Sequence, residues 1–141
     1  MRNSRRILLI EDDQVDALTV KRILGELNAG DRLNIVSDGE QALEFLQDSA
    51  QPRPSIILLD LNMPRMNGIE FLQIVKNDDS LKVIPVVVVT TSKGGQDITD
   101  SFRLGVAGYM TKPVNYQKFV EIITTIDRYW SLSELPHGDS S

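Results

Sequence analysis

Short runs of apolar residues alternate along this chain with longer stretches in which apolar residues recur every three or four positions. The runs lie at residues 6–10, 56–59 and 84–90, and charged or turn-forming residues follow each of them. Such runs are typical of strands that are buried on both faces of a sheet. Residues 32–35 alternate polar and apolar side chains, which indicates a half-buried edge strand. A fifth strand is predicted at residues 106–110.

Between and after these runs, the spacing of apolar residues predicts five helices. Asp38 and Asn115 are suitable N-caps for the second and fifth helices, and the third helix is predicted over residues 67–76. The fourth helix, over residues 96–104, has the weakest apolar face. The first and last helices have the clearest apolar stripes, which comprise Val20, Ile23, Leu24 and Leu27, and Phe119, Ile122, Ile123, Ile126 and Trp130.

Strands that alternate with helices over short connections favour an α/β fold, a doubly wound parallel sheet with helices on both faces. We predict five strands in the flavodoxin-like order 2-1-3-4-5, which places the switch point between strands one and three. Residues 1–130 are expected to form one domain, followed by a short polar tail at 131–141 with no output domain. The one histidine, His137, lies in that tail and is expected to be inert.

Composition excludes several classes of protein. Hydrophobic residues make up 41% and charged residues 25% of the 141 residues, as in ordinary globular domains. No apolar run approaches the ~20 residues of a membrane helix, and the lack of cysteine excludes disulfides and thiolate sites. The net charge of −5 argues against direct binding to nucleic-acid phosphates. We therefore expect a cytoplasmic protein that binds neither nucleic acid nor membrane.

Carboxylates follow two strands that are neighbours in the predicted order. Glu11 and Asp12 come directly after the first strand, and Asp60 comes directly after the third. Because the carboxyl ends of adjacent parallel strands meet at one edge, we expect these acids to converge. Their mutual repulsion requires either protonation or a bound cation. Oxygen ligands without histidine or cysteine favour a hard ion such as Mg²⁺.

Two more polar residues end strands at the same edge. Thr90 offers a hydroxyl after the fourth strand, and Lys112 offers an ammonium that can neutralise a phosphoryl oxygen. Each of these residues alone has a structural explanation, such as a turn or a solvated charge, but together they favour a single site. At such a site Asp60 is suited to be the nucleophile that accepts a phosphoryl group as an acyl phosphate.

Four segments, in order, resemble the receiver domains of response regulators, the aspartate-accepting half of two-component signalling. They read ILLIEDD, ILLDLNMPRMNG, VVVVTTS and YMTKP, and the similarity covers about residues 5–128. The resemblance implies a CheY-like fold. It also implies a phosphoprotein that catalyses its own phosphorylation and can dephosphorylate itself, rather than a conventional enzyme.

The resemblance also implies residue roles. It assigns the phosphoacceptor to Asp60, Mg²⁺ binding to Glu11, Asp12, Asp60 and the backbone carbonyl of Asn62, phosphoryl contacts to Thr90 and Lys112, and conformational switching to Thr90 and Tyr109. The bond from Lys112 to Pro113 is expected to be cis. Thr91 occupies a position that is often small in the family. With Asn62 and Ser92 it is expected to tune the lifetime of the phosphoryl group.

The implied partner is a sensor histidine kinase, and the implied output is conformational switching with protein–protein contact. The end of the last helix is similar to small receivers that partner bacterial phytochromes and related hybrid kinases, and these often dimerise. Tyr129 and Trp130 could serve a homodimer through the fourth helix, fifth strand and fifth helix. Alternatively, Trp130 packs against the last strand.

Three other interpretations stay open. A flavodoxin-type carrier has the same topology, but the three acids would repel a flavin phosphate. A phosphatase using Asp60 usually needs an acid two residues later, where this chain has Asn62. A degenerate receiver would bind partners without phosphorylation, against which the full set of site residues argues.

Overall fold

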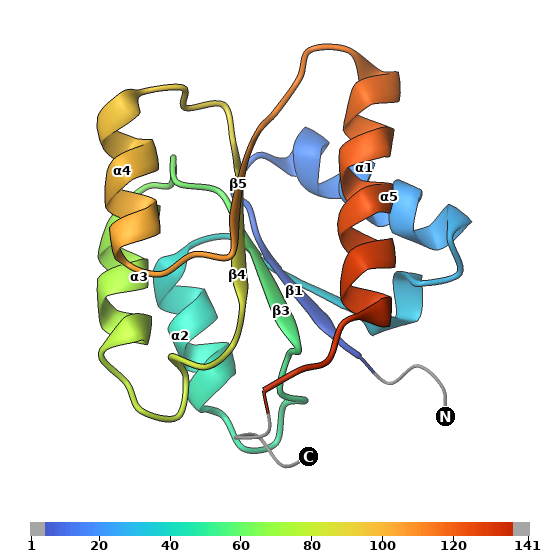
Figure 1. Cartoon of the computed structure of the whole chain (residues 1–141). Coiled ribbons are helices and arrows are strands. Elements are labelled where there is room, and N and C mark those ends of the chain that lie inside the picture. The colour runs from blue at the N-terminus through green and yellow to red at the C-terminus, as the bar shows by residue number, and fades with distance from the viewer. Residues whose placement is uncertain (1–4, 137–141) are drawn as a thin grey trace.

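The computed structural model describes residues 5–136 and has a five-stranded parallel sheet between two layers of helices (Figure 1). The strand order is β2-β1-β3-β4-β5, which confirms the predicted doubly wound topology. The strands are β1 (Ile7–Ile10), β2 (Leu33–Val36), β3 (Ile56–Leu59), β4 (Val86–Thr90) and β5 (Gly108–Thr111).

The helices divide into two layers. Figure 1 shows α2, α3 and α4 on one face of the sheet and α1 and α5 on the other. Their bounds are α1 (Gln14–Glu26), α2 (Gly39–Gln47), α3 (Gly68–Lys76), α4 (Gly95–Arg103) and α5 (Tyr116–Leu132), with a 3₁₀ turn at Gly30–Arg32. The predicted caps are confirmed, because the side chains of Asp38 and Asn115 accept hydrogen bonds from the third residue of their helices.

Alternate residues of each central strand point to opposite faces of the sheet and pack into two separate apolar cores. Leu8 and Ile10 of β1 pack with the α2–α4 layer, around the fully buried Phe71. Ile7 and Leu9 pack with α1 and α5. Because both faces are covered, the central strands contain apolar residues at every position, as the sequence pattern indicated. The predicted stripe of α1 is buried except for Leu27, which follows the helix and is 36% exposed.

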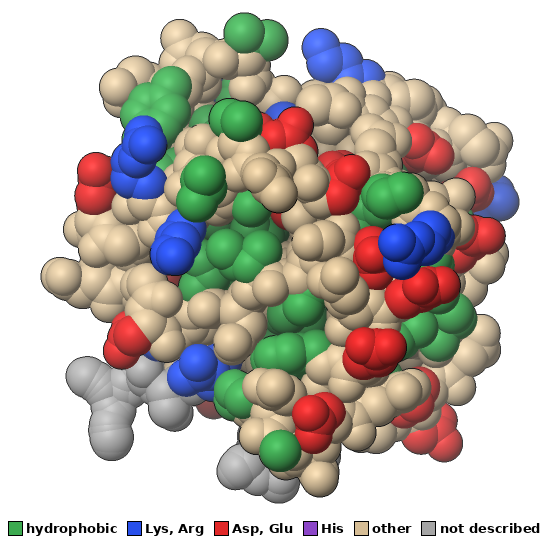
Figure 2. All heavy atoms as spheres, turned by 180° about the vertical axis from the view of Figure 1, so that it is seen from behind, with side chains coloured by type: hydrophobic (Ala, Val, Ile, Leu, Met, Phe, Trp, Pro, Cys, Tyr) green, Lys and Arg blue, Asp and Glu red, His purple; other side chains and the backbone are tan. Residues whose placement is uncertain are grey.

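β2 lies at the edge of the sheet and is half buried, as predicted, but its polar and apolar residues do not alternate between exposed and buried positions. Figure 2 views the molecule from the side of β2, and apolar side chains are visible at the centre of this face. Ile35 is 38% exposed. Arg32, predicted as an outward polar residue, is buried and forms an ion pair with Asp127 of α5 at 3.1 Å. Its guanidinium also donates to the carbonyl of Arg5 at 2.7 Å, and these two acceptors compensate for its burial.

The C-terminal segment returns across the end of the sheet that lies opposite the carboxyl ends of the strands. α5 continues to Leu132, and Leu135 and Pro136 line a shallow surface groove beside Pro54 and Pro85. His137 and the rest of the predicted tail lie outside the described residues. Within residues 5–136, no helix combines the length and the apolar character that crossing a bilayer requires.

Candidate functional site

Three carboxylates meet where β1 and β3 end. Ile10 and Leu59 are paired in register, so Glu11 and Asp60 follow at the same level of the sheet. Carboxylate oxygens of Glu11, Asp12 and Asp60 lie within 4.8 Å of one another. Glu11 and Asp60 are buried, whereas Asp12 is exposed. The structure thus brings the three predicted acids together in one cluster, called the acidic site below.

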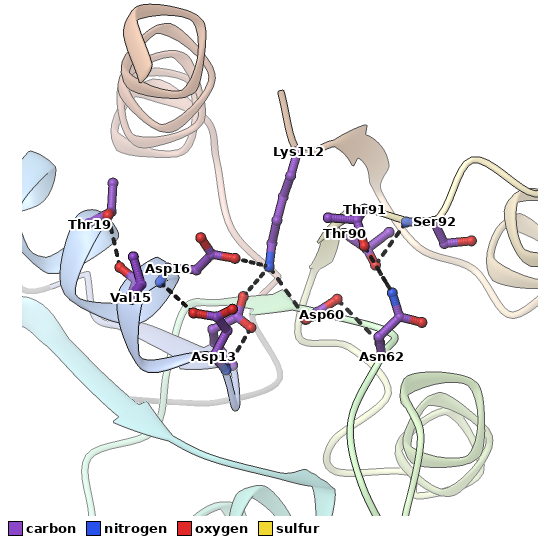
Figure 3. A network of polar contacts seen from close by, with 11 residues as sticks. Asp13, Val15, Asp16, Thr19, Asp60, Asn62, Thr90, Thr91, Ser92 and Lys112 are labelled. Carbon is purple, nitrogen blue, oxygen red and sulfur yellow. Dashed lines mark hydrogen bonds and ion pairs between the residues drawn. The ribbon is translucent and has the colours of Figure 1, made fainter. Parts of the chain in front are cut away.

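Lys112 reaches the acidic site from the end of β5, and its side chain is only 7% exposed (Figure 3). Its ammonium lies 2.6 Å from Glu11 Oε1, 2.8 Å from Asp16 Oδ2 and 3.4 Å from Asp60 Oδ2. Asp16 was not among the residues predicted for this site. The residue lies in the first turn of α1, and only the packing of that turn against the β5–α5 connection brings it to Lys112.

The peptide bond from Lys112 to Pro113 is trans, since residues 5–136 contain no cis peptide bond. The prediction of a cis bond is therefore wrong for this structure. The Lys112 backbone N–H donates to the Thr90 carbonyl at 2.7 Å, which continues the β4–β5 ladder by one residue. With the trans bond, the Lys112 side chain reaches Glu11, Asp16 and Asp60. Trans is also the preferred isomer of an X–Pro bond, by about 0.5–1 kcal/mol.

The charges at the acidic site are strongly coupled. Burial raises the pKa of the Glu11 carboxyl from 4.5 to about 8, and the charge of Asp60 adds to this rise, while Lys112 opposes it. Burial alone would lower the pKa of Lys112, but its hydrogen bonds to Asp16 and Glu11 outweigh that effect and raise it. Lys112 is thus cationic at neutral pH, but its single positive charge does not balance the negative charge of the surrounding carboxylates. A site of carboxylate oxygens with unbalanced negative charge fits a hard divalent cation.

Asn62 lies across the approach to Asp60 (Figure 3). Its backbone N–H donates to Asp60 Oδ1 at 3.2 Å. Its side-chain amide donates to the hydroxyls of Thr90 and Thr91 at 3.4 and 3.2 Å. Thr90 is fully buried and Thr91 is exposed, so the amide links the loop after β3 to the end of β4. The amide thus lies beside the position that a group bound to Asp60 and Thr90 would occupy.

The loop that carries Asn62 is closed by glycine. The Gly68 N–H donates to the Leu61 carbonyl at 3.0 Å. A Cβ at position 68 would lie 2.7 Å from Leu61 Cα and 3.1 Å from the Asp60 carbonyl oxygen, so no other residue fits without displacing the backbone. The turn signals after Asp60 therefore have a structural purpose, which is to return the chain closely past Asp60 before α3 begins.

A second chain of contacts connects the acidic site to β5 and α4. The Ser92 N–H donates to the Thr90 hydroxyl at 3.4 Å, and the Ser92 hydroxyl donates to Asp97 of α4 at 2.6 Å. The half-buried Tyr109 of β5 donates its hydroxyl to the Ser92 carbonyl at 2.9 Å. Thr90, Ser92 and Tyr109 thus form one continuous network, through which a change at Thr90 can reach the surface of α4 and β5.

Comparison with known proteins identifies relatives along most of the chain. The family described as "Response regulator receiver domain" matches residues 7–124. The chain is 39% identical to "Response regulator Rcp1" of Synechocystis sp. over 128 residues, which cover 88% of this chain and 87% of that protein.

Two solved structures have the same fold. The phosphorylated cyanobacterial phytochrome response regulator RcpA superposes with a TM-score of 0.88 at 36% identity, over 94% of this chain and 98% of that chain. The Mn(2+)-bound form of Rcp1 superposes with a TM-score of 0.85 at 37% identity, over 94% of this chain and 99% of that chain.

Proposed function

The chain belongs to the receiver-domain family of response regulators, and from this premise we propose that it accepts a phosphoryl group on Asp60 from a sensor histidine kinase. One observation carries the proposal. The buried Asp60 carboxylate belongs to a cluster of acids suited to a divalent cation, and the Lys112 ammonium lies 3.4 Å from it. These are the two sources of positive charge that phosphoryl transfer to a carboxylate requires.

In the proposed reaction, an Asp60 oxygen attacks the phosphorus of a kinase phosphohistidine. The new P–O bond forms as the P–N bond breaks, and the imidazole leaves with the bonding electron pair. Lys112 neutralises one phosphoryl oxygen, and the hydroxyl of Thr90 donates to another. Most of the catalysis comes from positioning and charge neutralisation. The product is an acyl phosphate on Asp60.

Glu11, Asp12 and Asp60 would hold Mg²⁺, together with the backbone carbonyl of Asn62. The all-oxygen donor set within 4.8 Å suits this hard ion. When bound, the ion would offset negative charge on the transferring group. The Mn(2+)-bound form of the relative Rcp1 supports a divalent metal in this family.

Switching would follow from the network around Thr90. Movement of its hydroxyl toward the phosphoryl group would break the contact with Asn62 and bias Ser92 and Tyr109 toward a second arrangement. We expect α4 to respond, because Ser101 is its one buried residue and little apolar surface holds the helix on the sheet. Asn62 and Thr91, which flank Asp60, would set how long the phosphoryl group lasts.

We propose that the kinase binds around the mouth of the acidic site. The reaction is proposed to occur in the cytoplasm. Val15 and Leu18 of α1 are 72% and 60% exposed, and Val114, two residues after Lys112, is fully exposed. Apolar side chains that are exposed within two residues of Asp16 and Lys112 suit a protein donor better than a small one. The likeness to the phytochrome response regulator RcpA favours a photoreceptor kinase of phytochrome type as that donor.

A homodimer through α4, β5 and α5 is the second proposed contact. β5 is an open edge of the sheet, and an apolar surface groove beside it is lined by Val87, Met110 and Tyr129. Tyr129 is 60% exposed and meets Trp130 edge-on. Trp130 itself is partly buried against the core between the sheet and α5, which supports its structural role and leaves Tyr129 as the better anchor.

Intact mass after incubation with acetyl phosphate and Mg²⁺ tests the proposed function. We expect the parent to gain the mass of one phosphoryl group and Asp60→Asn to gain none. A parent that gains nothing from acetyl phosphate or from histidine kinases would instead be a degenerate receiver that acts through contacts alone.

A further inference from the structure

Lys112 has an acidic partner that acceptance of a phosphoryl group on Asp60 does not require. An ammonium has three N–H donors, and the Lys112 side chain contacts three carboxylates, those of Glu11, Asp16 and Asp60. Its donors are thus all committed before any phosphoryl group is present. Contact with a phosphoryl oxygen therefore requires Lys112 to give up one partner.

We infer that Asp16 is a positioning residue that holds Lys112 while Asp60 is unphosphorylated and releases it when Asp60 carries a phosphoryl group. The inference rests on the proposed function, since it concerns how the same lysine is shared. Asp16 lies 2.8 Å from the ammonium, closer than Asp60 at 3.4 Å. Asp16 thus occupies a donor of Lys112 that a phosphoryl oxygen on Asp60 would need.

Exposure identifies Asp16 as the partner that is released. Its side chain is 30% exposed, compared with 3% for Glu11 and 7% for Asp60. A carboxylate that loses its partner at the surface is hydrated by water, whereas one that loses it in the interior stays unpaired at a much greater cost. Lys112 can therefore exchange Asp16 for a phosphoryl oxygen while keeping its buried contact with Glu11.

The first turn of α1 holds Asp16 in place for this role. The Asp16 N–H donates to Asp13 Oδ1 at 3.0 Å, which caps the helix and fixes the direction of the turn. Figure 3 shows the Asp16 carboxylate pointing toward Lys112 across the acidic site, on the side away from Thr90. The ion pair thus joins α1 to the chain segment between β5 and α5 in the unphosphorylated protein, and phosphorylation would break this ion pair.

Asp16→Asn and Asp13→Asn form a matched pair for testing this inference. Each removes one negative charge from the same turn, and asparagine at position 13 still caps the helix. Asp13 is not among the three carboxylates that contact Lys112. A general charge effect would therefore change both variants alike, whereas the loss of a direct partner would change Asp16→Asn alone. Asp16→Glu, which keeps the charge, is the conservative variant.

The first readout is affinity for beryllofluoride, a phosphoryl mimic, in Mg²⁺. Without the Asp16 carboxylate, Lys112 is free to contact the mimic. The affinity for beryllofluoride should therefore be about two- to fivefold higher in Asp16→Asn than in Asp13→Asn, as expected for loss of a partly exposed ion pair. Asp16→Glu should bind it like the parent. Equal affinities in Asp16→Asn and Asp13→Asn would overturn the inference, while a parent that binds no beryllofluoride would overturn the proposed function itself.

The second readout does not depend on phosphorylation. The ¹⁵N resonance of the Lys112 ammonium, recorded by NMR without metal or mimic, should shift in Asp16→Asn and stay at the parent position in Asp13→Asn. A purely structural role for Asp16 would leave this resonance in place, and that result would overturn the inference whatever the affinities.

Discussion

Replacing Lys112 with methionine tests whether its ammonium is the charge that lets the buried acids coexist. Methionine keeps most of the side-chain length and its apolar character, but removes all three contacts with carboxylates. Glu11 and Asp60 have side chains only 3% and 7% exposed, so water cannot replace the lost partner. The substitution should therefore destabilise the protein when no metal is present.

The expected size of this loss follows from burial and protonation. Breaking a buried ion pair typically costs about 3–5 kcal/mol. The pKa of Glu11 is raised to about 8, so this group can stay protonated at pH 7 and moderate the repulsion. We therefore expect the free energy of unfolding to fall by about 3 kcal/mol in EDTA, the lower end of that range.

Magnesium should recover part of this loss, because it supplies positive charge to the same carboxylates. If Mg²⁺ binds Lys112→Met about tenfold more tightly than the parent, the loss in saturating Mg²⁺ is smaller by about 1.4 kcal/mol. Thermodynamic linkage requires the two numbers to agree, so calorimetric titration with Mg²⁺ provides an independent check.

The assay is urea unfolding followed by far-UV circular dichroism, in EDTA and in Mg²⁺, with the m-values compared to confirm a common mechanism of unfolding. Lys82→Met is the matched control. Lys82 is half exposed and pairs with the exposed Asp79, so its loss should stay within about 0.5 kcal/mol in both buffers. Equal losses for Lys112→Met in EDTA and Mg²⁺, with unchanged Mg²⁺ affinity, would refute the reasoning.

Three further predictions concern other parts of the molecule. In EDTA, the parent should become less stable as pH rises from about 4.5 to about 8, because folded Glu11 retains a proton that the unfolded chain has released; urea unfolding across this range should show a flatter slope for Glu11→Gln. Asp127→Ala should lower the free energy of unfolding by about 3 kcal/mol, since it leaves Arg32 buried without its anion, and Arg32→Met combined with Asp127→Ala should recover part of that loss in the same assay. Thr91→Ala should change the decay rate of phosphorylated Asp60, measured by intact mass over time, because Thr91 is one of the two hydroxyls that hold Asn62 across the approach; a decay rate equal to that of the parent would remove Thr91 from this role.

The parallel sheet and the edge of it that carries the acidic site could be predicted from the sequence. Apolar runs without polar positions can be satisfied only by strands covered on both faces, and alternation with helices makes those strands parallel. Once β1 and β3 are neighbours, Glu11 and Asp60 must meet, because each directly follows a strand at the same level. Asp38 and Asn115 were predictable as caps because capping is a contact between residues three apart.

The pairing of polar side chains across the fold could not be predicted from the sequence and depends on tertiary packing. Asp16 and Lys112 are 96 residues apart, and Arg32 and Asp127 are 95 apart, so no local pattern connects them. Both pairs depend on how α1, α5 and their connections pack over the sheet, and a shift of a few ångströms would separate them. Local periodicity specifies which face of an element is buried, whereas the choice among polar partners is a property of the packed molecule.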